Sequence, residues 1–99
     1  MIRALLILSA AALTLAALPA HATGKMRCDV PAAQRKPQDE LVRTITAQGW
    51  QVRKAKLDGG CYEVYGTTPE GERVEAYFHP VTFEKLLVSR RGQILYRKP

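Results

Sequence analysis

The hydrophobic period of the chain changes at Gly49, and this change constrains the fold more than any other feature of the sequence. Before Gly49 the apolar residues recur at helical spacing, and after it they alternate with polar residues as far as residue 90. Two groups, Asp58-Gly59-Gly60 and Thr68-Pro69-Glu70-Gly71, interrupt the alternation and are typical of tight turns. The sequence therefore predicts one helix followed by antiparallel strands, an α+β fold in two layers.

The helix is predicted between Pro37 and Gly49. Proline suits the first turn of a helix, Asp39 and Glu40 complement its positive N-terminal end, and glycine favours its C-terminal stop. The apolar residues of one face are Leu41, Val42 and Ile45. This spacing predicts about three helical turns that are amphipathic enough to lie on a sheet.

Strands are predicted at residues 50–57, 61–67 and 73–79, followed by an apolar run at residues 83–89. In the first strand the apolar positions shift phase near Lys54, which indicates a β-bulge or a strong twist. The sequence leaves open whether the tail, residues 92–99, extends the sheet or packs over an edge. The prediction is one N-terminal helix packed on a three- to four-stranded antiparallel sheet.

Alternation also assigns the side chains of the second and third strands to two faces of the sheet. The residues expected to face the helix are Tyr62, Val64, Val74, Ala76 and Phe78. The residues expected on the opposite face are Glu63, Tyr65, Arg73, Glu75, Tyr77 and His79. Antiparallel sheets tolerate solvent on one face, so we expect this second face to be open.

Residues 1–22 have the composition of a signal peptide. Arg3 supplies the positive start, residues 4–18 are all apolar or small, and Pro19 precedes the A-x-A cleavage site that ends at Ala22. The apolar run is shorter than the about 20 residues that a transmembrane helix needs. We therefore expect cleavage after Ala22 and a periplasmic or secreted protein. Residues 23–36 are predicted to be an extended leader, mobile except at Cys28, and residues 37–99 the folded domain.

Both cysteines of the chain, Cys28 and Cys61, lie after the predicted cleavage site. They form no C-x-x-C motif, and His79 is the only histidine left beside them, so neither a redox pair nor a zinc site is predicted. A small exported domain commonly uses such a pair as a structural disulfide. The chain-entropy relation gives this bridge roughly 3 to 4 kcal/mol. No metal and no cofactor are predicted.

The chain carries 15 Lys and Arg against 9 Asp and Glu, a formal net charge of +6 at pH 7. The basic residues are scattered in pairs rather than gathered in a block, which is typical of a solvated surface. Export argues against nucleic acid as a partner. The charge leaves an anionic lipid surface or another envelope polyanion as an alternative partner.

The second half of the chain resembles a known family. The residues that carry the resemblance are Gly49-Trp50, Gly60-Cys61-Tyr62-Glu63-Val64, Pro69-Glu70-Gly71, Val74-Glu75-Ala76-Tyr77 and Phe78-His79-Pro80. Over residues 37–90 the chain resembles the small PepSY-like domains of exported bacterial proteins, relatives of a region in the propeptides of thermolysin-type metallopeptidases. It departs from them at Phe83, where such domains often have glycine. The resemblance implies a helix-plus-sheet fold, no catalytic residues, and inhibition or local regulation of a peptidase.

Few residues of the predicted domain could carry catalysis. Ser89 is the only serine after the cleavage site, and it precedes Arg90-Arg91 rather than lying in a G-x-S-x-G turn. His79 is expected to be a strand-end residue. Glu63 and Glu75 are expected to form cross-strand ion pairs rather than a catalytic carboxylate pair. Their expected partners are Arg53, Lys54 and Arg73. We therefore predict that the protein is not an enzyme.

The candidate binding surface is the sheet face predicted to be open. Its residues are Tyr65, Tyr77, Glu63, Glu75 and His79. Aromatic side chains within a charged rim are typical of recognition surfaces, although Tyr65 and Tyr77 could equally form a stabilising cross-strand pair. An edge strand could also accept an extended peptide or a second copy of the chain. The expected partner is a protein or peptide, a peptidase among them, and a homodimer is left open.

Overall fold

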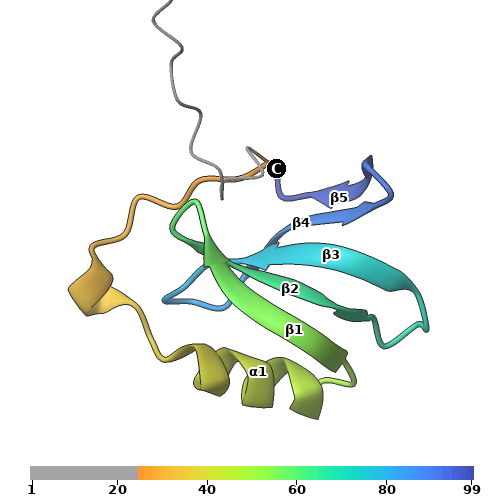
Figure 1. Ribbon diagram of the computed structural model, residues 1–99, viewed down its shortest axis with the longest axis horizontal. Helices are drawn as coiled ribbons and strands as arrows, with labels where there is room; N and C mark the ends of the chain where they lie inside the picture. Colours follow the sequence, from red (N-terminus) through yellow and green to blue (C-terminus); the bar gives the residue numbers. More distant parts are fainter. Residues whose placement is uncertain (1–24) are drawn as a thin grey trace, which may run out of the picture.

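The computed structural model describes residues 25–99, and the predicted signal peptide at residues 1–22 lies outside this range. In chain order the elements are η1 (Ala32–Gln34), α1 (Gln38–Ala47), β1 (Gln51–Asp58), β2 (Cys61–Thr67), β3 (Arg73–Phe78), β4 (Lys85–Arg90) and β5 (Gln93–Arg97). The strands form one antiparallel sheet in the order β1-β2-β3-β4-β5 (Figure 1). The α+β architecture is confirmed, with one α-helix within residues 25–99. No helix within residues 25–99 is long and apolar enough to cross a membrane.

The predicted sheet of three to four strands was too small, because the tail forms a fifth strand. Arg91 and Gly92 make the turn between β4 and β5, with φ values of 51° and 80°. Two positive φ values in succession match the twist of a two-residue hairpin turn. All residues of β5 are exposed, so its sequence carries no burial pattern that separates it from a loop.

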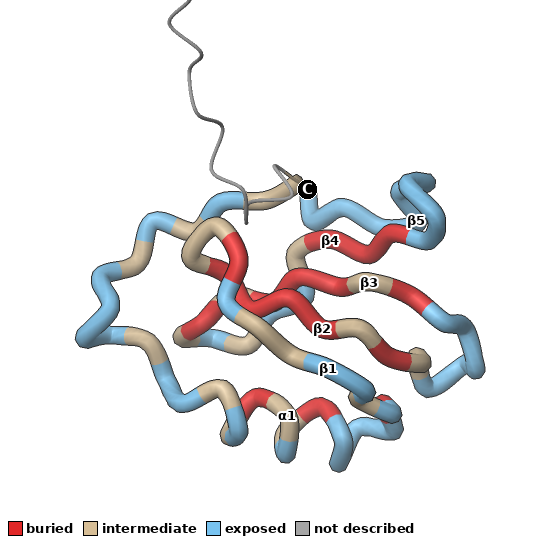
Figure 2. Tube along the Cα trace, in the orientation of Figure 1, coloured by how far each residue is buried: buried red, intermediate tan, exposed pale blue. Residues whose placement is uncertain are grey.

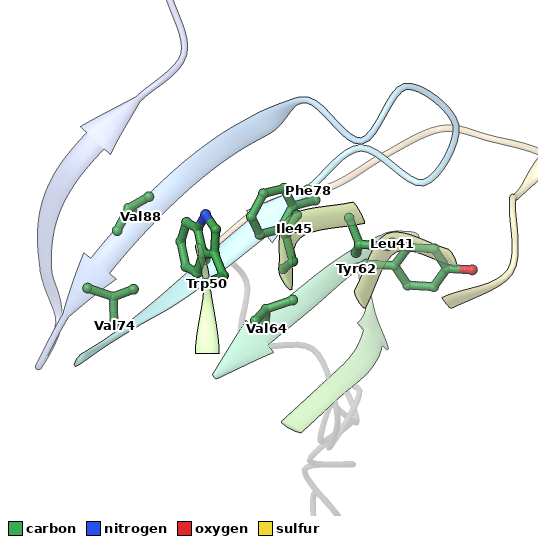
Figure 3. Packing of buried hydrophobic residues seen from close by; sticks show 9 residues of the cluster. Leu41, Ile45, Trp50, Tyr62, Val64, Val74, Phe78 and Val88 are labelled. Atoms are coloured by element: carbon green, nitrogen blue, oxygen red, sulfur yellow. The ribbon is translucent and has the colours of Figure 1, made fainter. Parts of the chain in front are cut away.

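The core lies between α1 and the sheet. Leu41 and Ile45 are the buried residues of α1, and Figure 3 shows both projecting from the helix toward the strands. Trp50 and Phe78 meet edge to face, with ring centroids 5.5 Å apart. The sheet residues of this cluster are Tyr62, Val64, Val74, Ala76, Phe78 and Val88. Each large apolar side chain buried here contributes about 1.5 to 3 kcal/mol to stability. The face assignment of β2 and β3 toward the helix is therefore confirmed.

Residues 25–28 of the leader cross the other face of the sheet, so the leader contacts the strands at residues other than Cys28 as well. Cys28 and Cys61 form a disulfide with Cα atoms 5.1 Å apart, and the Cys28 N–H donates to the Gly59 carbonyl at 2.8 Å. The leader then passes round the end of the sheet toward α1 (Figure 1). There the Lys36 N–H donates to the Pro80 carbonyl at 2.9 Å.

Glycine is required where the leader crosses the β1–β2 turn. A Cβ atom on Gly59 would lie 2.3 Å from the Met26 carbonyl oxygen, and one on Gly60 would lie 2.2 Å from the Cys28 carbonyl oxygen. Both residues also have positive φ, 59° and 82°. The Asp58-Gly59-Gly60 turn therefore serves two purposes, because it reverses the chain and lets the leader backbone approach closely.

A second apolar cluster fills the space between the leader and the sheet. Cys61, Tyr77 and Leu87 are buried there, and the partly buried residues packed on them are Met26, Cys28 and Leu86. Figure 2 shows the buried residues of the central strands extending to the leader end of the sheet. The expectation of a fully open second face is therefore wrong. Tyr77 and Glu63 point away from α1 as predicted, but each is 0% exposed.

Phe83 has a φ of 62°, in the left-handed region where glycine is favoured. It therefore adopts the backbone conformation expected at this position of the turn without being glycine. Its ring packs against the main core, and the Lys36 Nζ lies 5.4 Å from the ring centroid. The gain in packing offsets the backbone strain, which costs about 1 to 2 kcal/mol.

Candidate functional site

The sheet face opposite α1 is divided into two parts. We call the part beneath the leader, where Tyr77 and Leu87 are covered by Met26 and Cys28, the leader half. The open half lies toward the other end of the strands, where β1, β3 and β5 begin and β2 and β4 end (Figure 1). It contains a cleft of about 460 Å³. The lining residues are Arg53, Tyr65, Gly71, Glu72, Arg73, Val74, Glu75, Ser89, Arg90 and Arg91.

Tyr65 forms the boundary of the cleft on β2. Its hydroxyl donates to Glu63 Oε1 at 3.3 Å, and the Nζ atoms of Lys54 and Lys56 lie 5.8 and 5.7 Å from its ring centroid. Burial and the negative charge of Glu63 raise the pKa of Tyr65. The phenol therefore stays neutral at physiological pH and keeps a proton that it can donate.

Glu63 is a fully buried carboxylate behind Tyr65. Lys56 stands opposite it in the β1–β2 register, and the Lys56 Nζ lies 3.5 Å from Glu63 Oε1. The other oxygen, Oε2, is buried and has no hydrogen-bond partner within the described residues. The predicted partners Arg53, Lys54 and Arg73 were wrong for Glu63, because the register places Lys56 directly across from it.

Glu75 is also paired with a lysine that the sequence did not suggest. Lys25 Nζ lies 2.8 Å from Glu75 Oε2 and 3.5 Å from the Ser89 Oγ. The hydrogen bond to Glu75 raises the pKa of Lys25, against a desolvation that lowers it. This pair lies where the leader half meets the open half, and the leader supplies its cation. The predicted pairing of Glu75 with a basic residue of the strands was therefore wrong.

A β-bulge in β1 turns two consecutive basic residues toward the open half. Val52 pairs with Gly66 and Lys54 with Tyr65, so Arg53 is the extra residue without a partner in the ladder. Val52 packs against the core on the helix side, whereas Arg53 lines the cleft and Lys54 lies over Tyr65. The bulge predicted near Lys54 is confirmed, and it explains the change of phase in the sequence.

Four arginines from three different parts of the chain meet at this cleft, which we call the arginine cleft. Arg53 comes from the bulge, Arg73 from the first residue of β3, and Arg90 with Arg91 from the end of β4 and its turn. All four are exposed, and none forms an ion pair with any residue between 25 and 99. The interpretation of the basic residues as uniformly scattered is therefore wrong at this end of the sheet.

The structure separates the five predicted surface residues. Tyr65 and Glu75 line the arginine cleft, and Glu63 lies beneath Tyr65. Tyr77 is buried in the leader half. His79 follows β3 at the far end of the sheet, where its Nδ1 accepts the backbone N–H groups of Val81 and Thr82 at 3.1 and 3.3 Å. His79 is therefore a turn residue there.

Sequence reasoning missed Lys25 and the arginine cleft. Lys25 lies in a segment without hydrophobic period, which gives no sign that it folds back on the sheet. The arginines did leave two signs in the sequence. Arg53 stands where the phase of β1 shifts, and Arg91 precedes Gly92 in a turn that favours Asn or Gly.

The cleft suits recognition of a charged or hydrogen-bonding group better than catalysis. Ser89 is buried, and its hydroxyl faces Lys25 rather than a histidine. No three His, Cys, Asp or Glu side chains within residues 25–99 are grouped so that they could hold a metal ion. The cleft offers guanidinium groups, a phenol and one paired carboxylate, which are binding groups.

A family model for the peptidase propeptide and YPEB domain, PepSY_2, matches residues 6–87. The chain belongs to the PepSY family. PepSY domains are generally non-catalytic, propeptide-like or inhibitor-like, and typically extracellular or periplasmic. A search of curated proteins and a search of solved structures each found no match. The matched range of this PepSY domain ends inside β4, so Arg90, Arg91 and all of β5 lie beyond it.

Proposed function

We propose that this PepSY protein is an exported, non-catalytic binding domain that inhibits or regulates a peptidase through protein–protein contacts. The description of the family names the propeptides of peptidases, and PepSY domains are generally non-catalytic. The signal-peptide composition of residues 1–22 supports a periplasmic or secreted location after cleavage behind Ala22.

The observation that carries this proposal is the open half of the sheet. The leader covers one part of the face and leaves the other part as a cleft of about 460 Å³. Ligand sites are concave, and they combine an apolar or aromatic wall with a few fixed polar groups. In this cleft the wall is the ring of Tyr65, and Glu75 with Ser89 supplies fixed polar groups. The arrangement supports docking of a partner segment across β1 to β4.

The edge strand β5 supports a second route to the same function. Ile94, Leu95 and Tyr96 are 50%, 45% and 38% exposed, and among the described residues β5 has a ladder partner on one side only. An unpaired edge can accept an extended peptide or the same edge of a second copy. A homodimer through β5 is testable by sedimentation, and it would leave the arginine cleft free.

A second candidate function is binding to an anionic lipid surface or another envelope polyanion. The observation that favours it is the set of four arginines without ion-pair partners within residues 25–99. Binding of this kind weakens steeply as ionic strength rises, and it requires no peptidase.

The deciding experiment tests capture and inhibition together. The exported, oxidised protein is used to capture peptidases from the envelope of its own cell, and each captured peptidase is assayed with a fluorogenic peptide. We expect addition of the protein to slow the assay. We expect Tyr65→Ala to weaken this inhibition about fivefold or more, since aromatic side chains buried at an interface often contribute over 1 kcal/mol.

The matched control is Tyr96→Ala, which removes an exposed tyrosine from β5 and leaves the cleft intact. Retained inhibition by this variant assigns the function to the cleft, and lost inhibition assigns it to the edge strand. Capture of no peptidase, or of a peptidase whose rate does not respond, would contradict the proposal. Tyr77→Ala is not informative here, because Tyr77 is buried and its loss would disturb the fold.

A further inference from the structure

We propose that the arginine cleft binds an acidic segment of the partner protein, with guanidinium groups donating hydrogen bonds to Asp or Glu carboxylates. This inference rests on the proposed function and adds the chemistry of the partner to it. It is carried by the local chain geometry, by the balance of charge and by the shape of the cleft.

The four cations of the cleft are all arginine, although the chain also has many lysines. A guanidinium group presents parallel N–H donors in a plane and binds a carboxylate with two hydrogen bonds, whereas an ammonium group acts as a point charge. Of the lysines near the site, Lys25 pairs with Glu75 and Lys56 pairs with Glu63, and Lys54 lies over the ring of Tyr65 without lining the cleft. The cations that line the cleft itself are therefore all guanidinium groups.

The cleft retains a positive charge after its internal pairs are counted. It contains two carboxylates, and that of Glu75 is neutralised by Lys25 at 2.8 Å. Glu72 is the one carboxylate of the lining without an ion pair within the described residues. Four guanidinium groups against one free carboxylate attract an anion and disfavour a basic partner.

Arg91 breaks a local rule of its turn, which supports a role in binding. It has a φ of 51° and precedes Gly92 with a φ of 80°, in a two-residue turn that favours Asn-Gly or Asp-Gly. A long side chain in this conformation strains the backbone, and Arg91 forms no ion pair within the described residues that would offset the strain. Residues that break local rules without a structural gain are often functional.

The bulge at Arg53 supports the same conclusion from another strand. In a strand that alternated regularly, Arg53 and Lys54 would lie on opposite faces. With the bulge, Arg53 reaches the cleft and Lys54 remains over Tyr65. The bulge therefore adds a cation to a surface that already holds others.

The shape of the site favours a peptide over a membrane. A bilayer is flat and engages the most prominent charges of a convex surface, whereas these arginines line a concavity between strands and a turn. A carboxylate at the end of a side chain can enter such a cleft. The phosphate of a lipid headgroup has related chemistry, and the test includes it as a separate probe.

The test measures binding of a fluorescent peptide with a run of aspartates between glycines, compared with a peptide of equal length in which asparagine replaces aspartate. We expect the acidic peptide to bind, the neutral one not to bind, and the affinity to fall as salt is raised. Arg73→Gln with Arg90→Gln should weaken binding about tenfold. The charge-matched control is Arg27→Gln with Arg97→Gln, two exposed arginines that do not line the cleft, and it should weaken binding less than about twofold.

The single variant Arg91→Asn separates binding from folding. Asparagine tolerates positive φ better than arginine, so this variant should raise the melting temperature while it weakens binding about threefold. A merely structural Arg91 would leave the affinity unchanged. That result would overturn the role of Arg91, and equal weakening by the two double variants would overturn the site.

Vesicles of phosphatidylglycerol and of phosphatidylcholine provide the remaining arm. If the protein binds phosphatidylglycerol vesicles more tightly than the acidic peptide, the ligand of the cleft is a lipid surface and the inference is overturned. Peptidase inhibition is assayed with the same variants. Inhibition that survives Arg73→Gln with Arg90→Gln refutes the acidic segment and leaves the proposed function standing. If the acidic peptide binds but no captured peptidase is inhibited, the proposed function is refuted and the binding of an acidic segment stands.

Discussion

The Tyr77 hydroxyl donates a hydrogen bond of 2.7 Å to Asp58 Oδ2. The two residues come from the third strand and from the end of the first, and both are buried, at 0% and 4% exposure. Asp58 immediately precedes the two glycines over which the leader passes. The bond therefore connects the middle of the sheet to the turn that carries the leader.

Tyr77→Phe is expected to destabilise the protein by about 1.5 to 3 kcal/mol. Hydrogen bonds to charged groups contribute this much, and the buried carboxylate of Asp58 loses a donor. Urea unfolding of the oxidised protein measures the loss. The control is Tyr96→Phe, which removes an exposed hydroxyl from β5 and should change stability by less than about 0.5 kcal/mol. Equal effects of the two substitutions would show that the Tyr77–Asp58 bond contributes no stability.

Gly60→Ala is expected to cost at least about 3 kcal/mol, because its Cβ would lie 2.2 Å from the Cys28 carbonyl oxygen and the leader would have to move. Gly92→Ala is the matched control, since Gly92 has almost the same φ, 80° against 82°, and no atom of the described residues beyond its chain neighbours lies within 4 Å of its Cβ position. It should cost only the backbone strain, about 1 to 2 kcal/mol. Thermal unfolding of both variants measures the two losses, and their difference is the contribution of the contact between the Gly60 position and the Cys28 carbonyl. A smaller loss for Gly60→Ala would mean that the leader does not lie against this turn.

Removal of the disulfide by Cys28→Ala with Cys61→Ala is expected to lower the free energy of unfolding by roughly 3 to 4 kcal/mol. The leader should also become accessible, because it loses its covalent attachment to β2. Limited proteolysis after Arg27 measures this exposure, and cleavage after Arg97 serves as the internal reference. A leader that stays protected in the double variant would show that Met26 and Lys25 hold it without the bond.

The ion pair between Lys25 and Glu75 should make stability depend on alkaline pH. The pKa of Lys25 is raised above its ordinary value of 10.5, so its contribution is fully present below pH 10.5 and is lost as pH rises through the folded-state pKa. Both side chains are about one-third exposed, so the contribution is at most about 1 kcal/mol.

Urea midpoints of the parent and of Lys25→Met therefore should differ at neutral pH and converge at alkaline pH. Lys25→Arg is the control, because a guanidinium group stays charged through this range. Its urea midpoint should therefore remain different from that of Lys25→Met at alkaline pH. A gap between parent and Lys25→Met that persists unchanged at alkaline pH would assign the effect to packing of the lysine stem instead.

The elements of this fold that depend on local chemistry could be predicted from the sequence. The alternation in β2 and β3, the phase shift near Lys54, and the turns at Gly59-Gly60 and Pro69-Gly71 follow from neighbouring residues, and the structure confirms each of them. The disulfide was predictable too, because the expectation of export and the presence of two cysteines leave few alternatives.

The features that depend on distant segments could not be predicted in the same way. Tyr77 was assigned to the correct face, but its cover is supplied by Met26 and Cys28, far away in the sequence. The pairing of β5 leaves all its residues exposed and so gives no apolar pattern. The arginine cleft is formed by the register of several strands, and pairs of basic residues in the sequence look the same whether they converge or disperse.

The Cys28–Cys61 bond has a consequence beyond holding the chain together. Lys25, which neutralises Glu75 at the border of the arginine cleft, belongs to the segment that this bond anchors. If the leader were to leave the sheet, the cleft would lose a neighbouring cation and gain an unscreened carboxylate. The disulfide thus helps to keep in place the cation that neutralises one carboxylate of the arginine cleft.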